Sequence, residues 1–172
     1  MKTIPLSQGY VALVDDEDYE RVNQFNWYAT VEHRAVYARR NVRYNGKQST
    51  EKLHRFVLGL KPGDPHVDHK DRNGLNCQKY NLRNASITQN NRNGRKPLTR
   101  DGIPTSSRFK GVFWSKDRSK WQATITVNKR SNFLGRFDSE LEAAHAYDTA
   151  ARQYFGEFAC PNFPNLRALI AA

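Results

Sequence analysis

The sequence predicts an α+β fold made of two modules joined by a basic linker. Three observations support this prediction. Short β-branched and aromatic runs fill residues 1–50, a polar stretch follows at 61–93, and three strand-like runs precede one helical stretch within 108–165. Residues 94–107 hold two Gly and two Pro with a basic bias, which is typical of a linker. We therefore expect a first module over 1–93 and a second over 108–165.

The first fifty residues are expected to form small strands, because apolar and aromatic runs alternate there with polar stretches. The runs lie at 10–14, 27–31 and 35–38. Asn45-Gly46 is the strongest two-residue hairpin signal in the chain. The acidic segment 15–23 predicts a short helix, and Thr50 is expected to cap a second helix that ends at Leu58.

Residues 61–93 contain few apolar side chains and many Asn, Asp, Arg and Gly. Such a stretch cannot bury enough apolar surface to build its own core. We expect it to be either a loop or a segment ordered around something other than apolar packing, such as a metal ion.

The second module shows strand periodicity followed by a helix. The expected strands are 109–114, 121–127 and 132–137. In the middle strand, Trp121, Ala123, Ile125 and Val127 alternate with polar residues, so one face packs and the other stays polar. Asp138 or Ser139 should cap a helix that runs to about residue 154 and stops at Gly156. Its expected apolar side consists of Leu141, Ala144, Tyr147 and Ala151.

The charge of the chain points to a polyanionic partner. The 172 residues include 28 basic and 17 acidic side chains, for a net charge of +11, and 38% of the residues are hydrophobic. Residues 91–136 alone carry twelve basic and two acidic side chains interleaved with aromatic residues, which favours a nucleic-acid phosphate backbone. A solvated cationic face is the alternative. An anionic membrane surface is disfavoured because this stretch has no amphipathic helical period.

Two features bear on the compartment. No apolar run approaches the length of a membrane span, and residues 1–10 lack the apolar segment of a secretory signal. Cys77 and Cys160 are too few for a disulfide framework or a zinc site, so we expect reduced structural thiols. These features predict a cytoplasmic protein of a bacterial or phage-infected cell, associated with its DNA.

Residues 66–93 hold side chains suited to phosphodiester hydrolysis, which needs a cation on the phosphate, a base for water and a group that holds the base. Asp68 offers a hard oxygen ligand, and His69 can accept a proton near neutral pH. Asn81 could orient the His69 ring, and the Asn90 amide oxygen could be a second ligand. Each residue alone is more often a turn or cap residue, and adjacent residues share a site only where a strand ends or twists.

The order and spacing of Asp68-His69, Asn81-Leu82-Arg83 and Asn90 resemble the HNH homing endonucleases of phages and group I introns. The segments 4–6, 14–19 and 53–57 also resemble the N-terminal part of phage-type HNH proteins, so the resemblance covers about residues 1–93. It implies a ββα-metal nuclease motif at about 61–93. In this motif Asp68 and Asn90 hold one divalent cation, Mg²⁺ or alternatively Mn²⁺, His69 is the general base and Asn81 orients it. The Cys pairs of zinc-binding HNH proteins are absent, so no zinc is expected.

Five motifs of the second module resemble the Apetala/ethylene-response-factor DNA-binding domain of plants. They are 109–112, 120–123, 133–137, 142–148 and 162–164. The resemblance implies a three-stranded antiparallel sheet that is packed on one helix and reads the major groove with its outer face. Phe113, Thr124 and Thr126 replace charged readers of the plant proteins, so the plant target sequence does not transfer. Trp121 and Phe133 also have a core interpretation. The expected DNA-binding residues are Lys110, Phe113, Lys116, Arg118, Lys120, Trp121, Thr124, Thr126 and Arg136, with Phe133 on the same face.

Together these observations predict a site-specific, metal-dependent DNA endonuclease of the homing type. Its partner is double-stranded DNA, with neither a small-molecule substrate nor a membrane. One active site per chain predicts a monomer that nicks one strand, and a dimer is the alternative. A DNA-binding regulator with an inactive nuclease half is the competing function. RNA binding is weaker because the sheet lacks ribonucleoprotein aromatic signatures.

Overall fold

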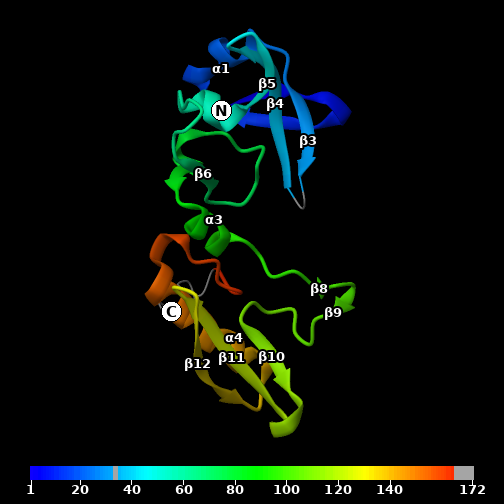
Figure 1. The fold of residues 1–172 in the computed structure, drawn as a ribbon, viewed down its shortest axis with the longest axis vertical. Coiled ribbons are helices and arrows are strands. Elements are labelled where there is room, and N and C mark those ends of the chain that lie inside the picture. Colours follow the sequence, from blue (N-terminus) through cyan, green and yellow to red (C-terminus); the bar gives the residue numbers. More distant parts are fainter. Residues whose placement is uncertain (33–34, 165–172) are drawn as a thin grey trace. The chain divides into compact units, whose positions relative to one another are not determined.

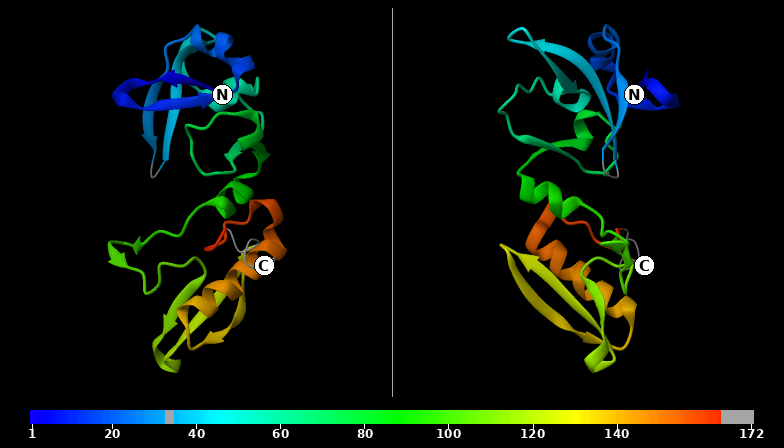
Figure 2. Two further views of the ribbon diagram at one scale, coloured as in Figure 1. Left: turned by 180° about the vertical axis from the view of Figure 1, so that it is seen from behind. Right: turned by 45° about the vertical axis from the view of Figure 1, so that its right-hand side comes forward.

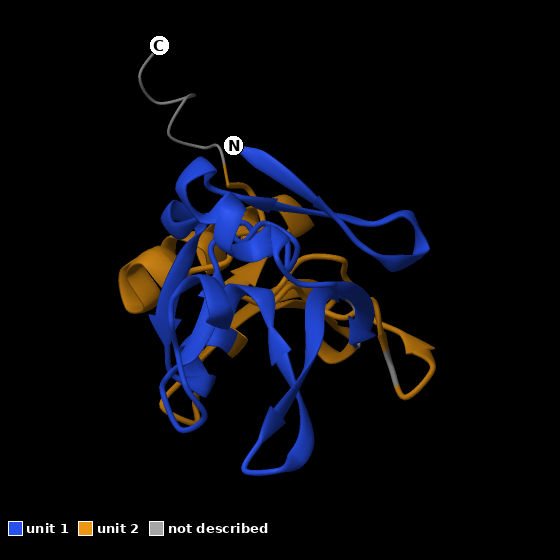
Figure 3. Cartoon of the chain, turned by 90° about the horizontal axis from the view of Figure 1, so that it is seen from above, with its two compact units in different colours: residues 1–90 blue, residues 91–172 orange. Residues whose placement is uncertain are grey.

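The computed structural model describes residues 1–32 and 35–164. In these ranges it is a mixed α/β protein with several small sheets and four α-helices (Figure 1). The chain divides into two compact units, Met1–Asn90 and Asn91–Ala172, which Figure 3 colours separately. Each unit has its own apolar core and is described by itself.

The first unit is built from small antiparallel sheets and short helices. β1 pairs with β2, β3-β4-β5 form a three-stranded sheet, and β6 pairs with β7. Its elements in chain order are β1 (Lys2–Pro5), β2 (Val11–Val14), α1 (Asp16–Asn23), β3 (Tyr28–Glu32), β4 (Ala35–Tyr44), β5 (Lys47–Lys52), α2 (Leu53–Val57), β6 (His66–His69), β7 (Leu82–Ala85) and α3 (Ile87–Asn93), which continues into the second unit.

The strands and the acidic helix expected before residue 39 are present, and so is the hairpin expected at Asn45-Gly46. Asn45 has φ 49° and Gly46 has φ 76°, the two left-handed conformations that a tight two-residue hairpin requires. The cap expected at Thr50 is wrong. Thr50 pairs with Asn41 inside the β4–β5 ladder, and α2 begins at Leu53, because the hairpin extends its pairing as far as Lys52.

The N-terminal hairpin braces the long polar loop between β6 and β7. Leu13 in β2 accepts a backbone hydrogen bond from Cys77 at 2.9 Å and donates one to Leu75 at 2.8 Å. The Asp15 carboxylate accepts from Lys79 N and from the Gln78 amide, at 2.7 and 3.1 Å. Cys77 is a free, buried thiol in the core, as expected, and burial raises its pKa to about 12. The buried core residues of the unit are Ile4, Ala12, Val14, Val22, Trp27, Ala38, Leu53, Val57, Val67, Cys77 and Leu82.

The second unit contains a three-stranded antiparallel sheet of order β10-β11-β12 with one long helix along one face (Figure 2). Ser139 caps this helix, its Oγ accepting from Leu141 N at 3.2 Å, and Gly156 ends it with φ 52°. The expected core positions Ala144, Tyr147 and Ala151 are buried. The elements are β8 (Thr99–Arg100), β9 (Ile103–Pro104), β10 (Val112–Ser115), β11 (Lys120–Val127), β12 (Arg130–Phe137) and α4 (Glu140–Phe155).

Two expectations for apolar side chains differ from the structure. Leu141 is 50% exposed, whereas Ala144, Tyr147 and Ala151 of the same expected apolar side are buried. In the ladder, Trp121 lies opposite Trp114 and Phe137 and packs against the Phe109 cluster. Trp121 therefore belongs to the packed face, as its place in the strand alternation favours, and not to the outer face.

The segment expected as a linker is ordered against the second unit. Residues 94–107 carry the small β8–β9 hairpin. The Lys96 ammonium donates to Val112 O at 2.7 Å, and Trp114 N donates to the Ser106 hydroxyl at 3.0 Å. Side-chain hydrogen bonds therefore attach this segment to the first strand of the sheet.

A buried carboxylate ties the end of the described chain to the sheet. Asp148 on α4 is fully buried and accepts from the backbone N–H groups of Asn162 and Phe163 at 2.7 and 2.8 Å. The Asn162 amide in turn bonds both backbone groups of Lys110. Three separated motifs of the plant-domain resemblance therefore meet in one hydrogen-bond network.

Gly111 provides a stability test of the second unit. It has φ +76°, and a Cβ placed there would lie 1.9 Å from the Tyr147 ring and 2.7 Å from Thr124 O. Gly102 has φ +80°, and a Cβ placed there would meet no atom within 4 Å. Substitution of Gly102 therefore measures the cost of the backbone conformation alone. We expect Gly111→Ala to lower the free energy of unfolding by about 2–4 kcal/mol and Gly102→Ala by about 1 kcal/mol. Chemical denaturation followed by circular dichroism measures both, and equal losses would contradict the packing argument.

Candidate active site

Asp68 and His69 are the last two residues of β6 and are both buried, with 3% and 6% of their surface exposed. The chain turns directly after them, since Arg72 N donates to His69 O at 2.9 Å. Their position at a strand end is the one that two adjacent residues need to serve a common site. Convergence of the two side chains on one ion stays a prediction.

Arg83 lies directly opposite Asp68 in the β6–β7 ladder and forms an ion pair with it. Arg83 Nε and Nη2 donate to Asp68 Oδ2 at 2.8 and 2.6 Å. Only 10% of the Arg83 side chain and 4% of the Asp68 side chain are exposed, so solvent screens this pair weakly. Sequence reasoning assigned no role to Arg83, because only the strand register shows that it faces Asp68.

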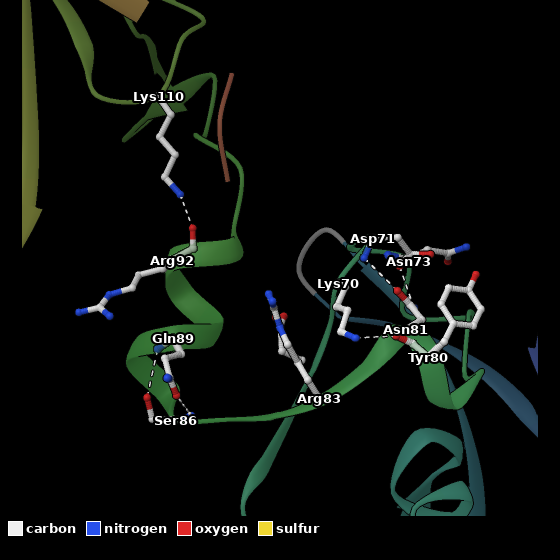
Figure 4. Close-up of polar contacts among 11 residues, drawn as sticks. Lys70, Asp71, Asn73, Tyr80, Asn81, Arg83, Ser86, Gln89, Arg92 and Lys110 are labelled. Carbon is white, nitrogen blue, oxygen red and sulfur yellow. Dashed lines mark hydrogen bonds and ion pairs between the residues drawn. The ribbon is translucent and has the colours of Figure 1, made fainter. Parts of the chain in front are cut away.

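Asn81 holds the loop between the two strands (Figure 4). Its amide donates to Asp71 Oδ1 at 3.0 Å and to Asn76 O at 2.8 Å, while its Oδ1 accepts from Asp71 N at 3.0 Å. Both amide hydrogens are engaged, and the oxygen retains capacity for one more donor. These bonds make Asn81 a residue that shapes the loop. The expected bond to the His69 ring stays a prediction.

Asn90 lies on α3, the helix that follows β7, and its side chain is exposed. A reciprocal cap fixes the start of this helix: Gln89 N donates to the Ser86 hydroxyl at 3.2 Å, and Ser86 N donates to Gln89 Oε1 at 2.8 Å (Figure 4). Asn90 N donates to Ser86 O at 3.0 Å in the same turn. The order strand, strand, helix is present, and a shared ion between Asn90 and Asp68 stays a prediction.

A second buried histidine, His54 on α2, packs against His69. The two rings are 4.9 Å apart between centroids and meet edge to face at 84°, and the Tyr37 ring is 5.9 Å from each. Burial lowers the pKa of His69 to about 4 and lowers the pKa of His54 well below its usual 6.5. The charges of Asp71 and Asp68 oppose the shift at His69. Sequence reasoning singled out no role for His54, because a lone His on a short helix carries no signal of its neighbours.

The outer face of the β10-β11-β12 sheet carries most of the expected DNA-reading residues. Phe113 pairs with Gln122, Gln122 pairs on its other side with Arg136, and Thr124 pairs with Phe133. Phe113 is 39% exposed and Phe133 is 56% exposed, so the core interpretation of Phe133 is wrong. Thr126, Lys116, Arg118 and Arg136 are also exposed, while Lys120 is half-buried and forms an ion pair with Asp138.

Lys110 is engaged within the protein. Its ammonium donates to Arg92 O at 2.7 Å and to Gly94 O at 2.5 Å, at the C-terminal end of α3 (Figure 4). A cation at this position stabilises the unpaired carbonyls of a helix end. The structure therefore gives Lys110 a capping role, and its expected contact with DNA stays a prediction.

A metal site composed of His, Cys, Asp and Glu alone is not present: in 1–32 and 35–164, no group of three or more such residues is arranged to hold an ion. Within the described residues, an ion at Asp68 would take its other ligands from amide oxygens, water or substrate. Among the helices of the described part of the chain, none has the length and apolar character needed to cross a membrane.

Similar proteins identify the family. An uncharacterised HNH endonuclease of Acanthamoeba polyphaga mimivirus is 32% identical over 161 residues, which are 90% of this chain and 76% of that protein. The chain belongs to the HNH endonuclease family. Protein 3.8 of Escherichia phage T7 is 36% identical over 99 residues, which are 57% of this chain and 76% of that protein.

The HNH chain also has plant relatives of a different kind. An ethylene-responsive transcription factor of Arabidopsis thaliana is 39% identical over 59 residues, 34% of this chain. The match spans only 13% of that plant protein. No family model matches the chain.

The buried histidines predict an acid-dependent loss of stability. Both have folded-state pKa values below the unfolded value of about 6.5, so the unfolded state binds more protons below that pH. Their contribution to the free energy of unfolding is fully present above pH 6.5 and is lost as the pH falls toward 4. Each histidine should add about 1.4 kcal/mol per pH unit to the slope in this window.

His54→Phe keeps an aromatic ring and removes one titrating group. We expect the free energy of unfolding of this variant to depend less steeply on pH, by the contribution of one histidine. Urea unfolding at pH values from 7 to about 4.5 measures the difference. Parallel curves for the wild type and the variant would contradict this assignment.

Proposed function

We propose that this chain is a metal-dependent DNA endonuclease of the homing type, in which the first unit hydrolyses a phosphodiester and the second unit holds the DNA. One observation carries the proposal. Asp68 and His69 are buried at the end of one strand, opposite β7, and the helix with Asn90 follows. The mimivirus relative, which is named an HNH endonuclease, supports the same reaction class.

The donor set of the site fits a hard divalent cation. Asp68 supplies a carboxylate and Asn90 an amide oxygen, the ligand types that Mg²⁺ and Mn²⁺ prefer, and Mg²⁺ commonly takes its remaining ligands from water and substrate phosphate. The thiols do not suit such an ion, because Cys77 is buried in the core with a raised pKa. When bound, the ion would neutralise charge on the phosphate and on the leaving oxygen.

The side chains divide the remaining work of the reaction. His69 is neutral at pH 7 because burial lowers its pKa, so its ring can take a proton from water as the water oxygen attacks phosphorus. The new P–O bond forms while the bond to the 3′ oxygen breaks. A phosphate beside the ring would raise the pKa of His69 and make it a stronger base. Asn81 keeps the loop after His69 in place, and Asn90 is the second ligand.

The second unit is proposed to hold double-stranded DNA through the outer face of its sheet. The plant relatives named as transcription factors support this role. Phe113, Phe133 and Arg136 supply exposed aromatic and guanidinium surface on that face, and the Arg136 guanidinium lies 5.1 Å above the Phe133 ring. Lys116 and Arg118, in the turn between β10 and β11, supply charge for phosphates. A monomer with one such site would nick one strand.

A DNA-binding regulator with an idle nuclease half is the second candidate. The Arg83–Asp68 ion pair favours it, because a guanidinium already occupies the proposed metal ligand. Binding without cleavage in Mg²⁺, Mn²⁺ and Ca²⁺ would support this alternative.

Plasmid nicking tests the nuclease proposal. Supercoiled plasmid with Mg²⁺ should give open-circular product, and a chelator should stop the reaction. His69→Ala should lose about 10²–10⁴-fold in rate, the usual contribution of a general base. Asn84→Ala, an exposed neighbour on β7, is the matched control and should nick like the wild type. Equal activity in His69→Ala would remove His69 from the mechanism.

Salt dependence tests the DNA contacts of the second unit. Each phosphate contact contributes about 0.9 to the slope of log affinity against log salt, so the double variant Lys116→Gln/Arg118→Gln should lower the slope by about 2. A double variant of the first unit, Lys47→Gln/Lys61→Gln, removes the same charge from exposed positions and should leave the slope close to that of the wild type. Fluorescence anisotropy with a labelled duplex measures both, and equal slopes for the two double variants would contradict the assignment.

A further inference from the structure

The ion pair between Arg83 and Asp68 places a permanent cation on the proposed metal ligand. Arg83 Nε and Nη2 donate to the same oxygen, Asp68 Oδ2, at 2.8 and 2.6 Å. The pair lies across the β6–β7 ladder, and both side chains are nearly enclosed. Figure 4 shows the Arg83 side chain extending away from the ribbon of β7. The carboxylate is therefore held in position and neutralised before any ion arrives.

A divalent ion and this guanidinium compete for one carboxylate. Two cations that share a buried anion repel each other, and the weak screening at such a site strengthens the repulsion. Withdrawal of Arg83 from Asp68 is costly, because it breaks an ion pair between two nearly enclosed side chains. The ion can bind Asp68 well only when another anion pairs with the Arg83 guanidinium in place of Asp68.

The substrate supplies such an anion. A phosphodiester offers two oxygens whose geometry matches the guanidinium fork, so arginine binds phosphate in the same two-bonded manner as carboxylate. In the proposed function the scissile phosphate must come close to Asp68, because Asp68 would hold the ion that neutralises charge on that phosphate. The phosphate that the enzyme cuts is thus within the range of the guanidinium that blocks its metal ligand.

We propose that Arg83 makes metal loading depend on DNA, an inference that rests on the proposed nuclease function. In the free protein Arg83 forms an ion pair with the Asp68 carboxylate. With DNA bound, Arg83 turns to a backbone phosphate and leaves the carboxylate to the ion. Because coupling between two ligands is reciprocal, DNA then raises the affinity for the ion and the ion raises the affinity for DNA by the same factor.

Mn²⁺ binding followed by electron paramagnetic resonance tests the inference without reference to cleavage. The full-length protein is titrated with Mn²⁺ in the absence and presence of a mixed-sequence duplex, and the Mn²⁺ bound by the duplex alone is subtracted. For the wild type we expect the duplex to raise Mn²⁺ affinity about 5–150-fold, the usual range of coupling between two sites. An unchanged affinity would overturn the inference.

Substitution of Arg83 should change both the Mn²⁺ affinity of the free protein and the increase in that affinity caused by the duplex. Arg83→Gln removes the competing charge, so the affinity of the free protein for Mn²⁺ should rise and the effect of the duplex should fall to about twofold or less. Arg83→Lys keeps the charge without the planar fork and should fall between the wild type and Arg83→Gln. Arg43→Gln removes the same charge from an exposed position on β4 and should match the wild type. Circular dichroism confirms that each variant is folded.

Asp68→Asn distinguishes failure of the inference from failure of the proposed function. If Asp68→Asn abolishes Mn²⁺ binding while Arg83→Gln lowers it or leaves it unchanged, Arg83 does not compete with the ion and the inference fails, although the metal site stands. If Asp68→Asn binds Mn²⁺ like the wild type, Asp68 is not a ligand and the metal assignment of the proposed function itself fails.

Discussion

The polar hairpin that carries the candidate active site depends on the buried amide of Asn81. The loop from residue 70 to 80 has little apolar surface, and Asn81, only 1% exposed, bonds it at Asp71 and Asn76. Asn76 in turn donates to the other oxygen of Asp71 at 2.8 Å. A buried polar group left without a partner costs about 1–3 kcal/mol, so loss of the amide would release several bonds of the loop together. The positions of Asp68 and His69 follow from this network, because the loop begins where β6 ends.

The same principle operates in the second unit. There the buried Asp148 binds backbone N–H groups of the segment after α4, and Asn162 carries the network on to Lys110. The side chain of Lys110 then reaches the end of α3. In both units a buried carboxylate or amide holds a segment that apolar packing alone cannot hold. The motifs 109–112, 142–148 and 162–164 of the second unit each contribute residues to this network.

Local signals in the sequence predicted the features that depend on neighbouring residues. The turn at Asn45-Gly46 and the Ser139 cap are set by backbone conformation and by side chains within three residues. The expectation that 61–93 is ordered by something other than apolar packing is correct only in part. Hydrogen bonds of Asp and Asn side chains hold its loop, but Val67, Cys77 and Leu82 lie in the apolar core of the unit. Local signals failed at Thr50, where strand pairing with β4 extends past a good capping residue. Tertiary pairing competes with local propensity in such cases and prevails.

Features that depend on register or on distant packing could not be predicted. Arg83 faces Asp68 only because β6 and β7 pair in one particular register, and a shift of one residue would turn Arg83 to the other face. His54 meets His69 because α2 packs beside the end of β6, which no spacing in the sequence reveals. For the site itself, the sequence identified candidate residues through their spacing, while the electrostatic state of those residues required the structure.

The charges at this site disfavour the binding of a metal cation and favour the binding of an anion. Asp68 is neutralised by Arg83, and His54 and His69 are kept uncharged by burial. An approaching phosphate can bind the Arg83 guanidinium, and it raises the pKa of a nearby imidazole. In the proposed mechanism, binding of a phosphodiester would therefore both favour binding of the ion and strengthen the base. An enzyme of this design would limit metal-dependent chemistry to the time that it spends on DNA, because the substrate itself completes the charge balance of the site.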